Sequence, residues 1–374
     1  MADKTVVIAA GGTGGHLFPA AAFAEDMRRR GWRIVLITDE RGRRYAEKFP
    51  ADEMHSVAAS TIQGFNPLRA AKGALSIWKG VGEAKALLTA LDPKLVAGFG
   101  GYPSLPALWA ARDQKRPILI HEQNAVLGRV NRLFAGDAAA IACGFERLDK
   151  LPPAAAARKH VVGNPVRPPI VAARDTPYPE LPAGGPIRLL VIGGSQGARI
   201  LGDVIPAAIG QLSEDLRGRL MVTQQTREEQ VGEVTRAYAE VGVRAEIAPF
   251  FSDIGPRIAG CHLVIARAGA STVTELAAVG RPAILVPLAI ASDDHQSANA
   301  EGLAAVAAAD VLLEPAFTEA ALAALLTQRL GDPHGLSVRA AQAKTSGRTD
   351  AAKALADLAE QVAGLSLYGA SSDA

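Results

Sequence analysis

The chain has 374 residues, of which 49% are hydrophobic and 21% charged, and its formal net charge is +2. These values exclude a disordered chain, and the length favours two domains over one. Its two cysteines, Cys143 and Cys261, exclude a disulfide framework, and no apolar run approaches the ~20 residues that a membrane span needs.

Strand-like apolar runs alternate with helical patterns along the whole chain. Asp3 and Lys4 lead directly into the first run, so we expect no signal peptide and a cytoplasmic or peripheral protein. Short, continuous apolar strands separated by amphipathic segments predict an α/β fold with parallel sheets covered on both faces. The predicted strands are Val6–Ala10, Ile34–Thr38, Leu95–Gly98, Ile118–Ile120, Leu189–Ile192, Leu220–Thr223, Leu263–Ala266 and Ala283–Val286.

A Pro- and Gly-rich stretch without periodicity, "RDTPYPELPAGGPIR" at 174–188, predicts a linker between two domains. We place the N-terminal domain at 1–168, the linker at 169–187 and the C-terminal domain at 188–345. A last Ala- and Leu-rich helix is expected at 346–366, packing back on the N-terminal domain, and 367–374 is expected to be a tail.

The two halves repeat one another. "VVIAAGGTGGH" in the first half matches "LLVIGGSQGAR" in the second, and a second pair of similar segments follows in the same order. This repetition predicts two Rossmann-like domains of similar topology that face each other across a cleft, with the ligand site between them.

The first glycine loop contains Gly11, Gly12, Gly14 and Gly15, between a strand and a helix. Such a loop permits positive φ angles and a close approach of the backbone to a phosphate. A dinucleotide site with an acid at Asp39 or Glu40 is an alternative, but the third glycine of that pattern falls on Leu17. A purely structural tight turn is the other alternative.

His16 ends this loop at the expected start of a helix. The helix dipole there disfavours the charged imidazolium, so a neutral imidazole could accept a proton. A hydrogen-bonded structural histidine is the alternative.

The second half carries three polar segments at strand ends. Ser195 lies in the second glycine loop, Glu275 lies in "RAGASTVTE" at 267–275, and "SDDHQSANA" follows the next strand. Hydroxyls and backbone amides suit a diphosphate, and a carboxylate suits a ribose diol. A favourable charge near a helix N-terminus is the structural alternative for Glu275.

Another polar run, "IHEQNAVLGRVNR" at 120–132, follows a first-half strand. Its residues lack the spacing of a metal site, so we expect a hydrogen-bonding rim for a sugar or peptide. Arg167, in "VVGNPVRP", could meet a phosphate or cap a hinge.

Taken together, these motifs are similar in kind and order to those of one family. "GGTGGH", "GFGGYPS", "IHEQNAVLG", "VVGNPVR", "GGSQGA" and "RAGASTVTE…GRPAILVP…DDHQSANA" resemble the MurG family of bacterial peptidoglycan synthesis, over about residues 5–360. The resemblance implies a GT-B glycosyltransferase fold. It also implies an inverting enzyme that moves GlcNAc from UDP-GlcNAc to the 4-hydroxyl of MurNAc in undecaprenyl-diphospho-MurNAc-pentapeptide (lipid I), giving lipid II.

The resemblance also assigns residues. His16 is the candidate general base near the acceptor, Glu275 would hold the ribose, and Phe251 would lie at the uracil. The residues assigned to UDP-GlcNAc are Thr13, Gly14, Gly15, Asn124, Arg167, Ser195, Phe251, Ala270, Ser271, Thr272, Val273, Thr274, Glu275 and Gln296, with His295, Glu122 and Tyr102 as additional candidates. No metal, cofactor or nucleic acid is expected, and closure about the linker is expected on donor binding.

A membrane surface is a further expected partner. Residues 65–91 combine apolar side chains, among them Leu75 and Trp78, with lysines and arginines. Residues 1–165 hold 23 Lys and Arg against 15 Asp and Glu. Both features suit the anionic inner leaflet at the cytoplasmic face of the bacterial inner membrane. An ordinary amphipathic helix on the sheet, with a chance charge imbalance, is the alternative.

Three other functions remain open from the residues alone. A UDP-GlcNAc 2-epimerase would share the architecture and the UDP site. A nicotinamide oxidoreductase would use the first loop and Asp39. A non-catalytic UDP-sugar-binding subunit is a third.

Overall fold

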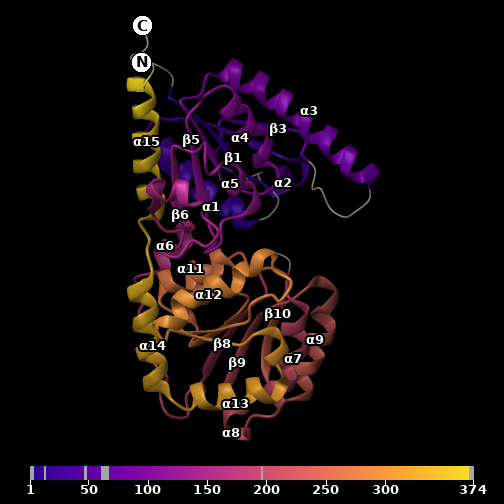
Figure 1. Ribbon diagram of the computed structural model, residues 1–374. Coiled ribbons are helices and arrows are strands. Elements are labelled where there is room, and N and C mark those ends of the chain that lie inside the picture. The colour runs from indigo at the N-terminus through magenta and orange to yellow at the C-terminus, as the bar shows by residue number, and fades with distance from the viewer. Residues whose placement is uncertain (1–3, 12–13, 46–48, 60–66, 195–196, 370–374) are drawn as a thin grey trace. The chain divides into compact units, whose positions relative to one another are not determined.

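The computed structural model describes residues 4–11, 14–45, 49–59, 67–194 and 197–369. Thr13 and Ser195, both predicted site residues, lie outside these ranges. The chain divides into two compact units, which are described separately (Figure 1). The first unit comprises Met1–Val166 and Asp350–Ala374, and the second comprises Arg167–Thr349.

The first unit is built on a parallel sheet of seven strands in the order β3-β2-β1-β4-β5-β6-β7. The chain reverses its direction of strand addition between β1 and β4, which is the doubly wound Rossmann arrangement. The elements are β1 (Thr5–Ala9), α1 (Gly14–Arg29), β2 (Arg33–Thr38), α2 (Glu40–Tyr45), β3 (Glu53–Ser56), α3 (Pro67–Leu91), β4 (Leu95–Gly98), α4 (Ser104–Asp113), β5 (Ile118–Glu122), α5 (Arg129–Phe134), β6 (Ala140–Cys143), the 3-10 helix η1 (Pro153–Arg158), β7 (Lys159–Val161) and α15 (Ala351–Gly369).

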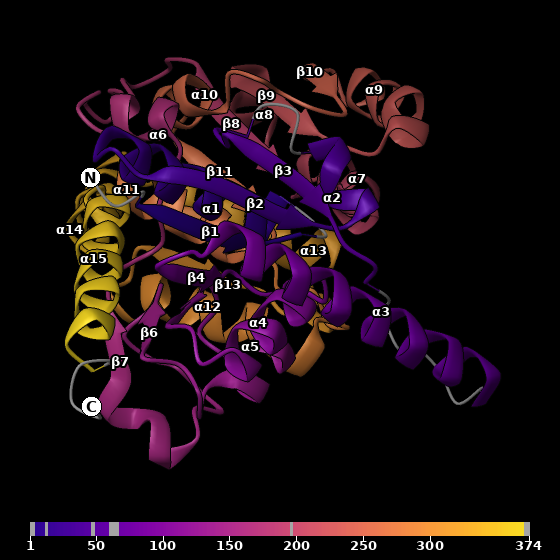
Figure 2. The ribbon, with the colours of Figure 1, turned by 90° about the horizontal axis from the view of Figure 1, so that it is seen from above.

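Strand alternation places the two faces of this sheet in different cores. Val6 and Ile8 of β1 pack with α1 and α15, whereas Val7 and Ala9 pack with α3, α4 and α5. A strand of this kind is apolar on both sides, because helices cover both faces of a parallel sheet. The C-terminal helix α15 is therefore part of the first unit's core (Figures 1 and 2).

The second unit has a parallel sheet of six strands in the order β10-β9-β8-β11-β12-β13, with the same reversal between β8 and β11. Its elements are α6 (Pro168–Ala173), β8 (Ile187–Ile192), α7 (Arg199–Gly210), α8 (Glu214–Arg219), β9 (Leu220–Gln225), η2 (Glu228–Gln230), α9 (Val231–Glu240), β10 (Arg244–Ala248), α10 (Ile254–Gly260), β11 (Leu263–Ala266), α11 (Ala270–Val279), β12 (Ala283–Leu285), η3 (Ser292–Asp294), α12 (His295–Ala305), β13 (Ala309–Val311), η4 (Glu314–Ala316), α13 (Glu319–Leu330) and α14 (Pro333–Ser346).

All eight predicted strands are present, within two residues at each end. Five further strands, β3, β6, β7, β10 and β13, were not predicted, because they are short or carry polar residues. Helix α6 lies inside the range that the sequence predicts as a linker, and it contacts α10 and α11. The presence of two units, each with its own parallel sheet, agrees with the expected GT-B fold.

Candidate functional site

Both sheets carry polar residues at the carboxyl ends of their central strands. In the first unit these follow β1, β4 and β5, and in the second they follow β8, β11 and β12. Ligands of open α/β sheets bind at this edge, beside the point where strand order reverses.

The first glycine loop is shaped by packing. A Cβ at Gly11 would lie 2.6 Å from Cγ of Pro103, so only glycine fits there. Gly14 and Gly15 do not use the positive φ angles that such a loop permits, because α1 already begins at Gly14. His16 is thus the third residue of the helix, and its side chain is half-buried.

His16 is connected to the neighbouring strand end by hydrogen bonds. Its Nδ1 lies 2.8 Å from Oε1 of Gln123, whose Nε2 lies 3.0 Å from Nδ1 of His121 and donates to the His121 carbonyl oxygen, also at 3.0 Å. Nε2 of His121 lies 3.2 Å from the Gly163 carbonyl oxygen. Gln123 and His121 are buried, and burial lowers the pKa of His121 to about 4.

Two glycines after β4 make room for the His16 ring. A Cβ at Gly100 would meet Cε1 of His16 at 3.4 Å, and one at Gly101 would meet Cδ2 at 3.4 Å. Both have positive φ angles, 88° and 77°, which favour glycine. Tyr102, the next residue, packs partly buried against the core that contains α3 and α4.

Glu122 shapes the loop that follows β5. Its carboxylate accepts hydrogen bonds from the backbone N–H groups of Asn124 and Gly128 at 3.0 and 2.8 Å. It also accepts from the side-chain amides of Asn124 and Asn131 at 3.1 and 2.8 Å. Because four donors of its own segment surround this carboxylate, Glu122 orders the loop that presents Asn124.

Asp39, an acid of the dinucleotide alternative, caps the N-terminus of α2. Its Oδ1 accepts a hydrogen bond from the Gly42 N–H at 2.8 Å, at the start of α2, and its side chain is buried. This contact is a helix N-cap.

The second glycine loop differs from the first. Gly194 and Gly197 have positive φ angles, 84° and 67°, and α7 begins only at Arg199. Gln225, at the end of β9, donates from Nε2 to the carbonyl oxygens of Gly194 and Pro249, at 3.0 and 3.1 Å. One side chain therefore ties this loop to the segment between β10 and α10.

The structure brings Arg167 and Glu275 together within the second unit. Nε and Nη2 of Arg167 donate to Oε1 of Glu275 at 3.0 and 2.7 Å. Glu275 is 7% exposed and lies in the second turn of α11. Burial raises the pKa of its carboxyl, and the Arg167 guanidinium opposes that rise.

The remaining residues of the α11 segment divide between core and surface. Ala270 and Val273 are buried, whereas Ser271, Thr272 and Thr274 are half-buried. Oγ of Ser271 has no hydrogen-bond partner among the residues that the structure describes. The first turn of α11 therefore combines hydroxyls with the N–H groups that a helix start leaves unpaired.

The loop between β12 and α12 is held in an unusual conformation. Asp293 and Asp294 both have left-handed backbones, with φ angles of 58° and 52°. His295 then begins α12, and Oε1 of Gln296 accepts from the Leu288 N–H at 3.0 Å. Left-handed non-glycine residues cost free energy and cluster at functional sites.

Phe251 lies between β10 and α10, and its ring is 8% exposed. The Arg257 guanidinium lies over this ring at 4.2 Å from the centroid. The side chain is thus part of the unit's own packing.

Sequence reasoning assigned no individual role to the side chains that support these sites. Besides Gln123 and Gln225, buried Arg267 donates to the carbonyl oxygens of Val286 and Pro287 and pairs with Glu314. Asn299, fully buried on α12, donates to the Ala268 carbonyl oxygen at 3.1 Å. Gln123, Arg267 and Asn299 lie within the polar motifs, whereas Gln225 lies outside them.

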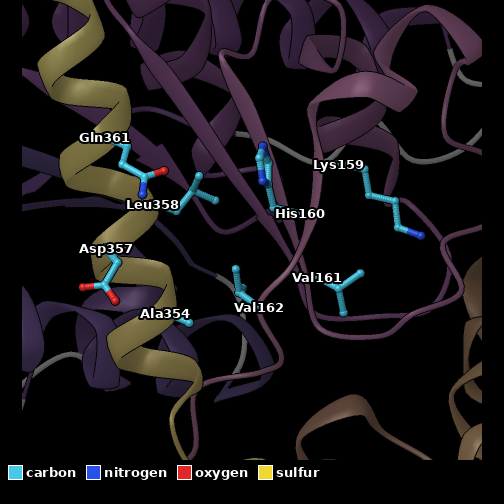
Figure 3. A pocket seen from close by; sticks show the side chains of 8 residues that line it. All are labelled: Lys159, His160, Val161, Val162, Ala354, Asp357, Leu358 and Gln361. Atoms are coloured by element: carbon cyan, nitrogen blue, oxygen red, sulfur yellow. The ribbon is translucent and has the colours of Figure 1, made fainter.

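A hollow of about 500 Å³ lies elsewhere on the first unit, between the edge strand β7 and α15 (Figure 3). Lys159 and His160 of β7 and Asp357 and Gln361 of α15 are among the residues that line it, and none of the predicted site residues is. In the described part of the chain, no three His, Cys, Asp or Glu side chains form a group that could hold a metal ion.

Comparisons with known proteins agree with this architecture. Residues 6–143 match the glycosyltransferase family 28 N-terminal domain, and residues 188–355 match the family 28 C-terminal domain. The crystal structure of Acinetobacter baumannii MurG superposes with a TM-score of 0.78 at 31% identity, covering 96% of this chain and 99% of that one.

Two similar proteins are named UDP-N-acetylglucosamine–N-acetylmuramyl-(pentapeptide) pyrophosphoryl-undecaprenol N-acetylglucosamine transferase. The one from Maricaulis maris is 52% identical over 95% of this chain and 97% of its own length. The one from Caulobacter vibrioides strain NA1000 is 51% identical over 96% and 99%. Because these relatives carry the transferase name, the 2-epimerase alternative is not better supported than a transferase. The chain belongs to the MurG family of N-acetylglucosamine transferases, within glycosyltransferase family 28.

Proposed function

We propose that this protein transfers GlcNAc from UDP-GlcNAc to the 4-hydroxyl of MurNAc in lipid I, giving lipid II with inversion at C1. The observation that carries this proposal is the 52% identity to a transferase of that name over 95% of the chain. We assign the acceptor to the domain at 1–168 and the donor to the domain at 188–345, with Arg167 on the donor side.

On the donor side, the Arg167–Glu275 pair and the start of α11 support nucleotide binding. Glu275 is held rigidly by two hydrogen bonds from Arg167, so its carboxylate is preorganised to accept hydrogen bonds from a ribose diol. Ser271, Thr272 and the free N–H groups of the first turn suit the diphosphate. Ser195, Phe251, His295 and Gln296 are assigned to the same ligand by their place in the family motifs.

On the acceptor side, His16 is assigned as the general base. The attacking hydroxyl must lose a proton as its oxygen bonds to C1 of GlcNAc, while the bond from C1 to the UDP oxygen breaks. The proton goes to His16, and UDP leaves with the electron pair. Helix N-termini of the second unit would stabilise the charge that develops on UDP, so the mechanism requires no metal.

The test is a transfer assay with radiolabelled UDP-GlcNAc and a short-chain lipid I analogue, with and without EDTA. Labelled lipid II analogue is the expected product, and EDTA should leave the rate unchanged. Absence of transfer would contradict the proposed activity, and strong inhibition by EDTA would contradict the metal-free mechanism. Formation of UDP-ManNAc from the donor alone would instead establish the epimerase.

We also propose that α3 of the first unit binds the anionic inner leaflet, at the cytoplasmic face of the bacterial inner membrane. One end of α3 extends away from the sheet (Figures 1 and 2). On this helix Leu75 and Trp78 are 66% and 76% exposed, whereas Ala84 and Leu88 are fully buried. No helix in the described ranges is long and apolar enough to cross a bilayer. An exposed Trp beside lysines suits peripheral attachment, which would bring the enzyme to its lipid-linked substrate for cell-wall growth, cell shape and division.

Sedimentation with vesicles of neutral and anionic phospholipid tests this surface. The L75S/W78S double variant should lose most of its vesicle binding while keeping its unfolding midpoint. Val338, 43% exposed on α14, provides the matched control V338S, which should bind as the native protein does. Equal binding by L75S/W78S and native protein would contradict the proposed membrane surface.

A further inference from the structure

The hydrogen bonds behind His16 fix which of its ring nitrogens carries the proton. Each bond in this chain of side chains has a donor and an acceptor, and two of the groups are backbone carbonyl oxygens, which can only accept. These two fixed ends, the carbonyl oxygens of Gly163 and His121, therefore determine which nitrogens of His121, Gln123 and His16 carry the hydrogens in these bonds.

The first fixed end is the Gly163 carbonyl oxygen. Nε2 of His121 lies 3.2 Å from it, so Nε2 must carry the hydrogen. His121 is 1% exposed, and an imidazolium there would be a buried charge, so the ring is neutral and its Nδ1 bears a lone pair. That lone pair accepts from the Gln123 amide at 3.0 Å.

The second fixed end is the His121 carbonyl oxygen, which lies 3.0 Å from Nε2 of Gln123. Two acceptors, this oxygen and Nδ1 of His121, thus face the same side of the Gln123 amide, and its NH2 group must point toward them. Oε1 of Gln123 then faces His16. Because Oε1 can only accept, Nδ1 of His16 must be the donor across their 2.8 Å contact.

We propose that Gln123 is a positioning residue that holds neutral His16 in its Nδ1–H tautomer and leaves the lone pair on Nε2 to take a proton. This inference rests on the proposed role of His16 as general base. Gln123 itself contacts no substrate in this proposal. It acts on the reaction through His16, as the third group that orients a catalytic base.

The residues around the His16 ring support this positioning role. Gln123 is 2% exposed, so water cannot compete for the Nδ1 side of His16. The absence of a Cβ at Gly100 and Gly101 allows the imidazole to lie against the backbone. Position and tautomer of the ring are therefore both determined before any substrate binds.

The direct test is ¹⁵N–¹H correlation NMR of the histidine side chains in the full-length protein. His16 is assigned by comparison with H16A. The neutral ring of His16 should show a protonated Nδ1 and an unprotonated Nε2. In Q123M, which keeps the length of the side chain but removes both polar groups, the two tautomers should mix or reverse. Nε2–H as the main form in native protein would overturn the inference.

The kinetic test separates positioning from stability. Q123M should lower kcat by about 10- to 100-fold with an unchanged KM for UDP-GlcNAc. The reason is that misorienting the base slows proton transfer but does not affect donor binding. The matched control is Q114M, since Gln114 hydrogen bonds near the end of α4, away from the sheet's carboxyl edge. A Q123M enzyme with native kcat would overturn the inference.

These results also distinguish this inference from the proposed function. If native protein shows the Nδ1–H tautomer but transfers no GlcNAc, the function fails and the tautomer assignment stands. If native protein transfers GlcNAc but shows Nε2–H, the function stands and the role of Gln123 fails.

Discussion

The two glycine loops have similar sequences, yet the structure uses them differently. After β1, the helix begins inside the glycine run, Gly11 packs on Pro103, and the side chain of His16 is presented. After β8, Gly194 and Gly197 adopt left-handed backbones, and α7 begins only at Arg199. Glycine is thus required by close packing at Gly11 and by backbone conformation at Gly194. This difference supports the proposal that the first loop acts through the His16 side chain, whereas backbone amides at the second bind an anion.

The largest expected effect on kcat comes from removing the side chain of His16, which follows the first glycine loop. H16A should lower kcat by about 10²- to 10⁴-fold, the usual contribution of a general base, while leaving the KM for UDP-GlcNAc unchanged. Steady-state kinetics with the lipid I analogue measure both. The control H160A changes an exposed histidine on β7 and should behave as the native enzyme does. Native turnover in H16A would remove the chemical difference between the two loops.

The next effect concerns the second unit, where we propose that the Arg167–Glu275 ion pair supports donor binding. R167L leaves the Glu275 carboxylate buried without its partner, so it should cost about 3 kcal/mol of unfolding free energy and raise the KM for UDP-GlcNAc about tenfold. R147L, which breaks an exposed pair with Asp149, should cost no more than about 1 kcal/mol.

The double variant R167L/E275M separates the two roles of this pair. Replacing both charges with apolar side chains should restore much of the stability without restoring donor binding. Recovery of the native KM in the double variant would show that the pair is only structural.

The burial of His121 makes the stability of the first unit fall at acidic pH. The pKa of His121 falls from its ordinary 6.5 to about 4 because the ring is buried. Between these values the unfolded chain binds a proton that the folded chain does not. Stability from this group is therefore complete above pH 6.5, falls as the pH drops toward 4, and loses about 3 kcal/mol in all.

Denaturant unfolding at several pH values checks this loss. H121Q should flatten the decline between pH 6.5 and 4, whereas H160Q should leave it unchanged. A decline of native size in H121Q would show that other groups cause the acid sensitivity.

The sequence predicted the two sheets well, because continuous apolar strands and glycine loops are local signals. It predicted the strand ends that carry polar residues less well: β5 extends through His121 and Glu122, which looked like loop. The bonding of Gln123 to His16, 107 positions away, and of Arg167 to Glu275, 108 away, could not be predicted from spacing. Such contacts depend on which strand ends meet, and only the assembled sheet determines that.

The smallest effects test the comparison of the two loops most directly. G11A should cost about 1–3 kcal/mol because its Cβ would clash with Pro103, and P103A should relieve part of that cost in the double variant. G194A should cost about 1–2 kcal/mol through its left-handed backbone, since among the described residues, its chain neighbours aside, no atom lies within 4 Å of the added Cβ. G194N should cost less, because asparagine tolerates that conformation, whereas asparagine at Gly11 should be worse than alanine. Unfolding free energies of these five variants measure the difference. If asparagine rescued both positions or neither, the two loops would not differ in how they use glycine.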